Sequence, residues 1–401
     1  MVKLMGKHNI IYLFIFALAF IFCTCDDPVF WAISQEVKPI EPRIKGVPTN
    51  FAVYDGRMYV ASGNTLYAYN KELDKTYWNE ETDTDGNILQ IASTGDYLYA
   101  LCSTDQNNNG KTIIKRFDKD NSSWHRIGGI IEDSSKVHNI FAAGDKLFIT
   151  AAALTSTANN ISYTILYIDN SGPAELITDT DRNDTGELNG AVFDGKSYFL
   201  STKDRGVYKI DDISKGALLI NKDTDGNVVD INFSGIINLQ DDDNTILLIA
   251  RDGDVYTVKD TITKIENVSM NNKDKDNRAT GALLIWRHPE MPSTRLLLVG
   301  RQDSLSYSVS FRFSYGYMEL ELDTIGIKSG SNFVEPGKNS LSTLIDFERY
   351  QTTLGKNPVN YLFQVPPDID SDMILFASTQ KNGVWSCRER NKENRYWNAE
   401  E

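Results

Sequence analysis

The pentapeptide Asp83-Thr84-Asp85-Gly86-Asn87 returns letter for letter as Asp223-Thr224-Asp225-Gly226-Asn227, 140 positions downstream. An Asp-Gly pair precedes each copy at nearly the same offset: Asp55-Gly56 before the first and Asp194-Gly195 before the second. Two markers that keep one register over this distance indicate a repeated fold. The register divides into about three units of roughly 40 to 50 residues, the size that a four-stranded propeller blade needs.

The rest of the chain is typical of many short strands. Runs of aromatic and β-branched residues alternate with Asp, Asn and Gly clusters, and almost no segment has helical periodicity. Five four-strand units fill residues 51–265, a sixth begins near 283 with its remaining strands in 307–322, and a final unit covers 361–397. The stretch 323–360 is an irregular insertion or a decayed blade. The sequence therefore predicts an all-β fold, a β-propeller of seven four-stranded blades, with eight blades as the alternative.

The first residues are typical of an exported protein. Lys3 and Lys7 precede an unbroken apolar run of 13 residues from Ile10 to Phe22, shorter than the roughly 20 that span a membrane. Cys23-Thr24-Cys25 follows and resembles the lipobox of bacterial lipoproteins, in the relaxed form of spirochaetal ones. This resemblance implies a lipid on Cys25, or on Cys23 as the fallback. An ordinary signal peptide or an uncleaved anchor is the alternative.

These features predict three regions. Residues 1–24 form a lipoprotein signal peptide, 25–47 the lipidated N-terminus and a linker, and 48–401 a single propeller domain with its insertion near 323–360. Phe30 to Ser34 is a candidate extra outer strand that would close the ring against the last blade. Of the remaining cysteines, Cys102 and Cys387 lie in strand-like sequence, where we expect buried free thiols.

Two short patterns resemble known propeller repeats. Leu66-Tyr67-Ala68-Tyr69 and Gly206-Val207-Tyr208 resemble quinoprotein-type repeats, and Arg116-Phe117-Asp118 with Ser123-Trp124 resembles the end of a kelch repeat. As a lipid-anchored propeller the chain is also similar to the propeller lipoprotein of the outer-membrane β-barrel assembly machinery. These resemblances imply an architecture and not a cofactor, because the vicinal cysteines of a quinone site are absent from the sequence.

The formal charge of −14 and the pI near 4.9 come without any basic run. A phosphate backbone would be repelled, so we expect no nucleic-acid partner. The four His residues are scattered, and the sequence holds no Gly-x-Ser-x-Gly elbow, phosphate loop or dinucleotide fingerprint. The chain is therefore not expected to be an enzyme.

The repeated acidic loops are the candidate metal sites. Each places three oxygen-bearing side chains at alternate positions before a Gly, as the first half of a calcium loop does. The bidentate Glu of the second half is missing, because Ala92 and Asn232 stand at its place. Turn formation is the favoured interpretation and calcium the alternative. The candidate ligands are Glu81, Asp83 and Asp85 in the first loop and Asn221, Asp223 and Asp225 in the second.

An aromatic strip is the candidate partner site. Phe311, Phe313, Tyr315 and Tyr317 alternate with small or polar residues along one stretch. Packing between blades is the favoured interpretation, and partner binding is the alternative.

The predicted function is a non-enzymatic scaffold in the bacterial cell envelope. It would be tethered to a membrane by lipid, on the periplasmic or the exposed side, and would hold another envelope protein or peptide on one face of the ring. The alternative is a propeller-class hydrolase, or a protein that binds a ligand or calcium, with its site at the central tunnel.

Overall fold

The computed structural model describes residues 44, 46–69, 78–103, 111–127, 135–154, 161–169, 172, 175–177, 184–271, 277–287, 295–303, 316–336, 353–366, 373–380, 382–389 and 395–399. The chain divides into a unit over Met1–Glu41 and a unit over Pro42–Glu401, and all described residues belong to the second. The signal peptide, Cys23, Cys25 and the candidate strand from Phe30 to Ser34 lie outside the described residues. None of the helices in the described part has the length and hydropathy needed to cross a bilayer.

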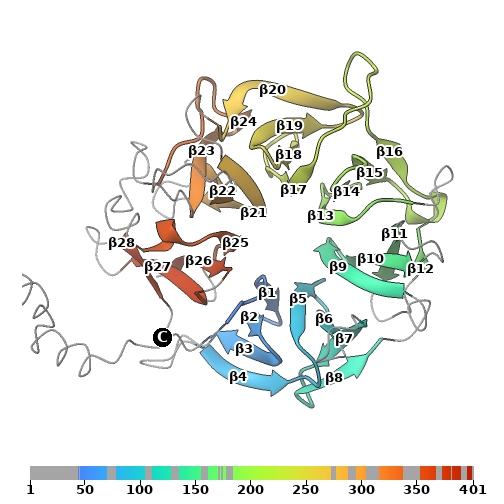
Figure 1. Cartoon of the computed structure of the whole chain (residues 1–401), viewed down its shortest axis with the longest axis vertical. Coiled ribbons are helices and arrows are strands. Elements are labelled where there is room, and N and C mark those ends of the chain that lie inside the picture. The colour runs from blue at the N-terminus through green and yellow to red at the C-terminus, as the bar shows by residue number, and fades with distance from the viewer. Residues whose placement is uncertain are drawn as a thin grey trace, which may run out of the picture. The chain divides into compact units, whose positions relative to one another are not determined.

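The second unit is a ring of seven four-stranded antiparallel sheets, each one blade (Figure 1). The strands of every blade pair in sequence order, from the channel outward. The predicted seven-bladed propeller is thus confirmed. Blades one to four are β1 (Ala52–Tyr54), β2 (Arg57–Ser62), β3 (Thr65–Tyr69), β4 (Trp78–Asp83); β5 (Ile88–Ser93), β6 (Leu98–Ser103), β7 (Thr112–Asp118), β8 (Ser123–Arg126); β9 (Ser135–Ala143), β10 (Lys146–Leu154), β11 (Ile161–Asp169), β12 (Glu175–Leu176); and β13 (Leu188–Phe193), β14 (Tyr198–Thr202), β15 (Val207–Ile210), β16 (Leu218–Ile220).

The remaining three blades follow the same order. A short 3-10 helix, η1 (Ile213–Lys215), lies in blade four, and η2 (Leu354–Lys356) precedes blade seven. Blades five to seven are β17 (Phe233–Asn238), β18 (Ile246–Ala250), β19 (Asp254–Val258), β20 (Ile262–Ser269); β21 (Asn277–Arg287), β22 (Arg295–Asp303), β23 (Tyr317–Asp323), β24 (Gly326–Ile327); and β25 (Val359–Phe363), β26 (Met373–Thr379), β27 (Val384–Glu389), β28 (Arg395–Ala399).

The Asp-Gly pair of the first blade forms its inner hairpin. Asp55 and Gly56 have φ of 48° and 67°, which fits the type I′ turn whose twist matches paired strands. The turn sets the register in which Val53 pairs with Met58. An Asp-Gly marker therefore predicts where an inner strand turns back.

A β-bulge recurs in the inner strands of blades two to seven. The register between the inner and second strands shifts near the first residues of each inner strand. A bulge adds a residue to one strand and redirects its side chain. In blades four to six, the bulge residues Asn189, Ser234 and Thr280 each bond the backbone of the next blade.

The stretch 323–360 contributes to two blades where it is described. The outer strand of blade six, β24, lies just beyond the segment 307–322 in which it was expected. Phe333 packs between blades five and six, and Leu354 between blades six and seven. These residues belong to the ring rather than to a separate lobe.

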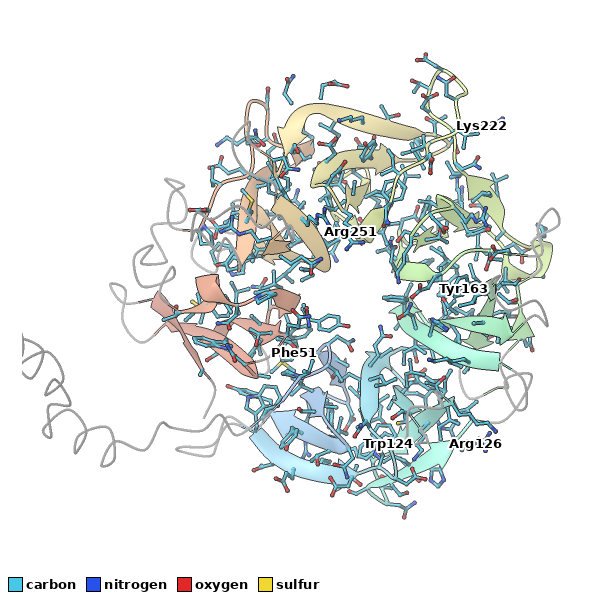
Figure 2. All side chains as sticks on the ribbon, in the orientation of Figure 1. Phe51, Trp124, Arg126, Tyr163, Lys222 and Arg251 are labelled. Carbon is cyan, nitrogen blue, oxygen red and sulfur yellow. The ribbon has the colours of Figure 1, made fainter. Side chains whose placement is uncertain are left out.

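Seven apolar clusters fill the seven junctions between neighbouring blades. The junction that closes the ring joins blade seven to blade one, and Figure 2 places Phe51 there. Trp78 of blade one meets Phe376 of blade seven edge-on, with ring centroids 5.4 Å apart. The Ser378 hydroxyl donates to the Pro48 carbonyl at 2.9 Å. Since all four strands of blade seven come from the C-terminal sequence, side-chain packing closes the described ring.

Both cysteines of the described chain are buried thiols outside any disulfide, as predicted. Cys102 lies in β6 and Cys387 in β27. Burial raises the pKa of the Cys102 thiol to about 11. This thiol is a packing group at neutral pH.

Candidate binding site in the central channel

The inner strand of each blade is an edge strand whose second edge faces the channel (Figure 1). Such an edge presents backbone N–H and C=O groups that the sheet does not use. A cavity of about 470 Å³ lies between these edges. It is lined by residues of all seven inner strands and by Asn50 and Phe51, just ahead of β1. Because each blade begins at its inner strand, the linkers between blades share one face of the ring, which we call the mouth face.

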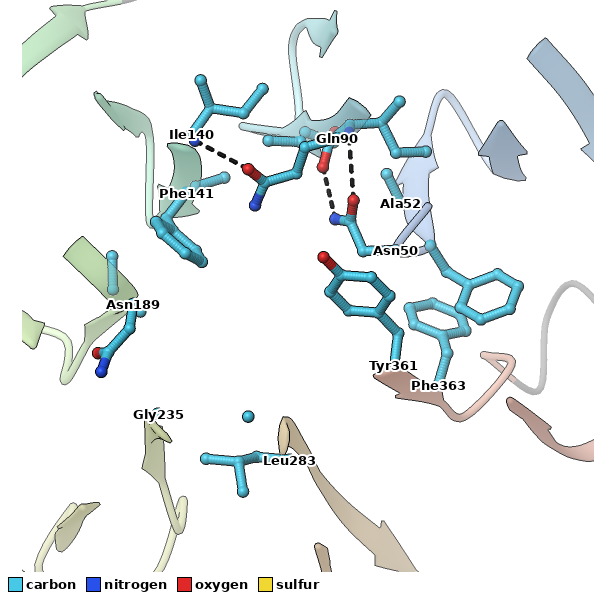
Figure 3. Close-up of a pocket in the computed structure, with 18 of the residues that line it drawn as sticks. Asn50, Ala52, Gln90, Ile140, Phe141, Asn189, Gly235, Leu283, Tyr361 and Phe363 are labelled. Atoms are coloured by element: carbon cyan, nitrogen blue, oxygen red, sulfur yellow. Dashed lines mark hydrogen bonds between the residues drawn. The ribbon is translucent and has the colours of Figure 1, made fainter. Parts of the chain in front are cut away.

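Asn50, just ahead of β1, binds the next blade with both ends of its side-chain amide. Its oxygen accepts the Ile91 N–H at 2.9 Å, and its nitrogen donates to the Ile91 carbonyl (Figure 3). Gln90 makes a related contact one blade on, where its Oε1 accepts the Ile140 N–H at 3.0 Å. Each such bond satisfies a backbone group that burial would otherwise leave without a partner.

Contacts of this kind join every neighbouring pair of blades. In each, a side chain of one blade bonds the backbone of the next blade within its inner strand or just ahead of it. We call these seven contacts the polar ring. Its members are Asn50 to Ile91, Gln90 to Ile140, Asn139 to Leu188, Asn189 to Phe233, Ser234 to Ala279, Thr280 to Val359 and Ser378 to Pro48.

Sequence reasoning missed the polar ring, although a signal for it exists. Six of its seven side chains are polar residues at the start of an inner strand, and they recur about every 40 to 50 positions. The spacing is that of the blades themselves. A search for one polar residue ahead of each inner apolar run would have found them.

The cavity is lined by amides, peptide groups and apolar or aromatic side chains. None of the described residues that line it carries a carboxylate, ammonium, guanidinium or imidazole group. Tyr361 and Phe141 extend into it, and Leu283 lines it from blade six, beside Gly235 of blade five (Figure 3). Tyr361 is half-buried, and its enclosure raises the pKa of the phenol. The cavity therefore offers neutral hydrogen-bonding groups between apolar surfaces.

Charged groups lie outside the cavity, on the linkers of the mouth face. Glu187 pairs with Lys203 at 2.7 Å, and Asp184 pairs with Arg205 at 2.7 Å. His138 meets the Tyr163 ring edge-on, with centroids 5.4 Å apart, and burial lowers the pKa of its imidazole. The two ion pairs hold the linker between blades three and four to the turn after β14, and the ring contact joins β9 to β11 within blade three.

The repeated pentapeptides lie in corresponding linkers on the mouth face, from blade one to two and from blade four to five. Their conformations differ. In the second copy, the backbones of Lys222 and Val228 pair as an isolated antiparallel β-bridge. The Asp223 carboxylate accepts hydrogen bonds from the N–H groups of Asp225 and Asn227 at 2.9 and 2.8 Å. These hydrogen bonds lower the pKa of the Asp223 carboxyl, and the bond from the Asn227 N–H has the largest effect.

In the first copy the acidic side chains bind neighbouring strands instead. Asp83 accepts the Thr65 hydroxyl at 2.6 Å. Asp85 pairs with the Lys115 ammonium, whose hydrogen bond lowers the pKa of that carboxyl. One sequence thus serves as a hairpin turn in one linker and as a strand connection in the other.

The other two candidate calcium ligands are placed separately. Glu81 faces the Arg57 guanidinium at 4.0 Å, and the Asn221 carbonyl accepts the Val229 N–H at 2.8 Å. Among the described residues, no three His, Cys, Asp or Glu side chains converge as a metal site. Calcium binding stays a prediction, and the contacts observed are those of turns and strand ends.

The predicted aromatic strip is described at one position. Phe311, Phe313 and Tyr315 lie outside the described residues. Tyr317 begins β23, is fully buried and meets Trp397 of blade seven with centroids 5.9 Å apart. At this position the residue packs between blades, the favoured interpretation of the stretch, and offers no surface to a partner.

Most of the exposed large apolar side chains of the described chain lie on the mouth face, on different blades. Of the six such residues in the described chain, four lie ahead of or at the start of an inner strand, at the start of a third strand, or in a linker between blades. Isolated exposed apolar residues are common, so it is their distribution that is informative. The four are Val47, Leu89, Ile161 and Val228.

Comparison with known proteins supports the fold. The chain matches a GH74 xyloglucanase from Xanthomonas campestris with a TM-score of 0.57 and 11% identity, over 90% of this chain and 55% of that one. YCF48 from Cyanidioschyzon merolae matches with a TM-score of 0.53 and 12% identity, over 88% of this chain and 99% of that one. The GH74 enzyme of Niastella koreensis matches with a TM-score of 0.52 and 14% identity, over 88% of this chain and 54% of that one.

These likenesses define the class of protein, a seven-bladed β-propeller, and the low identities limit them to the fold. The chain spans about half the length of the two GH74 proteins. No family model matches the sequence. No curated protein matches it significantly either.

Proposed function

We propose that this propeller is a non-enzymatic binding protein that holds another protein on its mouth face, with a segment of that partner in the central cavity. The observation that carries the proposal is the neutral cavity lined by all seven inner strands. Amide and peptide groups bind an uncharged ligand by hydrogen bonds, and the apolar surfaces pack against it.

The surface around the cavity supports the same proposal. Val47, Leu89, Ile161 and Val228 expose apolar side chains on the mouth face, where protein interfaces gain contact area. A lipid on Cys25, or on Cys23, would tether the ring to a membrane of the bacterial envelope, where such a partner would be met. The hydrolase alternative has GH74 proteins among its structural neighbours, at identities that show the fold alone.

Capture of the partner tests the binding site. Leu283 lines the cavity from blade six, so the larger side chain of Leu283→Trp should fill part of the cavity and lower recovery of a stoichiometric partner from detergent-solubilised envelope at least about tenfold. Ile325→Trp is the matched control, because Ile325 is an exposed residue of the same blade on the opposite face. Equal recovery with both variants would contradict the proposal.

Fatty-acid labelling tests the anchor separately. Cys25→Ala should abolish incorporation of labelled palmitate and release the protein from the membrane fraction. Cys23→Ala should leave both unchanged. Labelling that is lost only with Cys23→Ala would move the lipid to the fallback residue. A wild-type protein that incorporates no palmitate would reject the anchor.

A further inference from the structure

Two hydrogen-bonding groups in the cavity are not used by the fold. Gln90 is 7% exposed, and its Oε1 is occupied by the Ile140 N–H. Its side-chain nitrogen has no partner among the described residues, and neither does the Tyr361 hydroxyl. Figure 3 shows the Tyr361 hydroxyl and the Gln90 amide pointing into the same part of the cavity.

The neighbouring amides differ from Gln90. Asn50 binds Ile91 through both its oxygen and its nitrogen. Asn189 donates to Phe233 and accepts the Ser201 hydroxyl. These two side chains are committed to the junctions between blades. The Gln90 nitrogen and the Tyr361 hydroxyl are not among the fully buried polar atoms that lack a partner, so both are open to the cavity, where water or a ligand can bind them.

The bond from Ile140 fixes the Gln90 amide so that its NH₂ group faces the cavity. The Tyr361 hydroxyl is a second donor, because a phenol stays protonated at neutral pH. Two donors that converge favour an oxygen acceptor. Phe141 and Leu283 supply apolar surface in the same cavity.

We infer that Gln90 and Tyr361 form a carbonyl-binding pair that receives a peptide or side-chain amide of an uncharged segment of the partner. The inference rests on the proposed function and names the chemistry that its cavity selects. A carboxylate is disfavoured because the described residues of the lining include no cation to offset its loss of hydration. A peptide also matches the strand edges, which present N–H and C=O groups along the channel.

N-acetyl-leucinamide is the probe, since it carries two amide carbonyls and one apolar side chain without charge. Ligand-observed NMR with the full-length chain in detergent should show saturable binding. Tyr361→Phe removes the hydroxyl donor. Gln90→Glu removes the NH₂ donor and keeps an oxygen that accepts the Ile140 N–H. Each variant should weaken the probe about fivefold or more, as expected for one lost hydrogen bond.

Tyr198→Phe is the matched control, because that hydroxyl bonds Asp145 on blade three, outside the cavity, and should leave binding unchanged. N-acetyl-leucine should bind more weakly than its amide. Equal binding in wild type and both cavity variants would overturn the inference. Binding of cellobiose in place of the amide would overturn it as well and assign the pair to sugars. If Leu283→Trp still abolishes partner capture in either case, the proposed function stands without this pair.

Discussion

At the scale of single residues, the ring depends on side chains that reach across to the next blade. Asn50 is the clearest, because one amide satisfies both backbone groups of Ile91. No alternation or turn pattern in the sequence marks this role. The partner is 41 positions away, and the contact is defined only once the two inner strands stand side by side.

We predict that Asn50→Leu lowers the free energy of unfolding by about 1 to 3 kcal/mol, because it leaves the Ile91 N–H and C=O without partners. Asn121→Leu is the control, since Asn121 is exposed and donates only to Asp118. It should cost at most about 0.5 kcal/mol. Urea unfolding measures both, and equal losses would contradict the role given to Asn50.

Cys102 should make the free energy of unfolding fall as the pH rises in the alkaline range. Its pKa is raised from 9.0 to about 11, so the folded state holds the proton more tightly than the unfolded state. Its contribution is complete below pH 9 and is lost as the pH rises toward 11, by about 2 kcal/mol at pH 10.5. Cys102→Ala should remove that part of the decline in urea unfolding between pH 8 and 10.5. Parallel pH profiles of variant and wild type would refute it.

At the scale of elements, the blades were predictable because turns mark them. Asp55-Gly56 needs left-handed backbone at both positions, and Asp-Gly supplies it at small steric cost. The repeated pentapeptide was a correct marker of blade register. Its local structure was not predictable, because Lys115 and Thr65 hold the first copy while the second folds on itself.

Asp223 should act as the cap of its own turn. Asp223→Ala removes the acceptor for the N–H groups of Asp225 and Asn227, so amide exchange at Asn227 should accelerate about fivefold or more. Asp225→Ala should leave exchange at Asn227 unchanged. If calcium instead raises the Tm of wild type, and the rise disappears with Asp83→Ala or Asp223→Ala, metal binding is the role of these loops.

At the scale of the whole molecule, the described ring closes by packing, since blade seven is built from C-terminal strands alone. Phe376 is fully buried between the last and first blades. Phe376→Ala should cost about 3 to 5 kcal/mol and lower the Tm of a single cooperative transition. Trp124→Ala, at a half-buried outer position of blade two, should cost less. An early separate transition in Phe376→Ala would show that the blades unfold independently.

The number of blades followed from the sequence, whereas the cavity did not. Its lining residues come from seven strands spread over more than 300 positions, and which of them face the channel depends on the bulges. Tyr361 was expected only as a strand residue of the last unit. Its hydroxyl gains a role because ring closure brings blade seven beside Gln90 of blade two.

Photo-crosslinking in cells tests most directly whether the cavity is the binding site. A benzoylphenylalanine at position 141, in the cavity, should form a crosslink to one partner protein. The same group at position 325, on the opposite face, should form none to that partner. Crosslinks to one partner from position 325 and not from position 141 would show that it binds elsewhere.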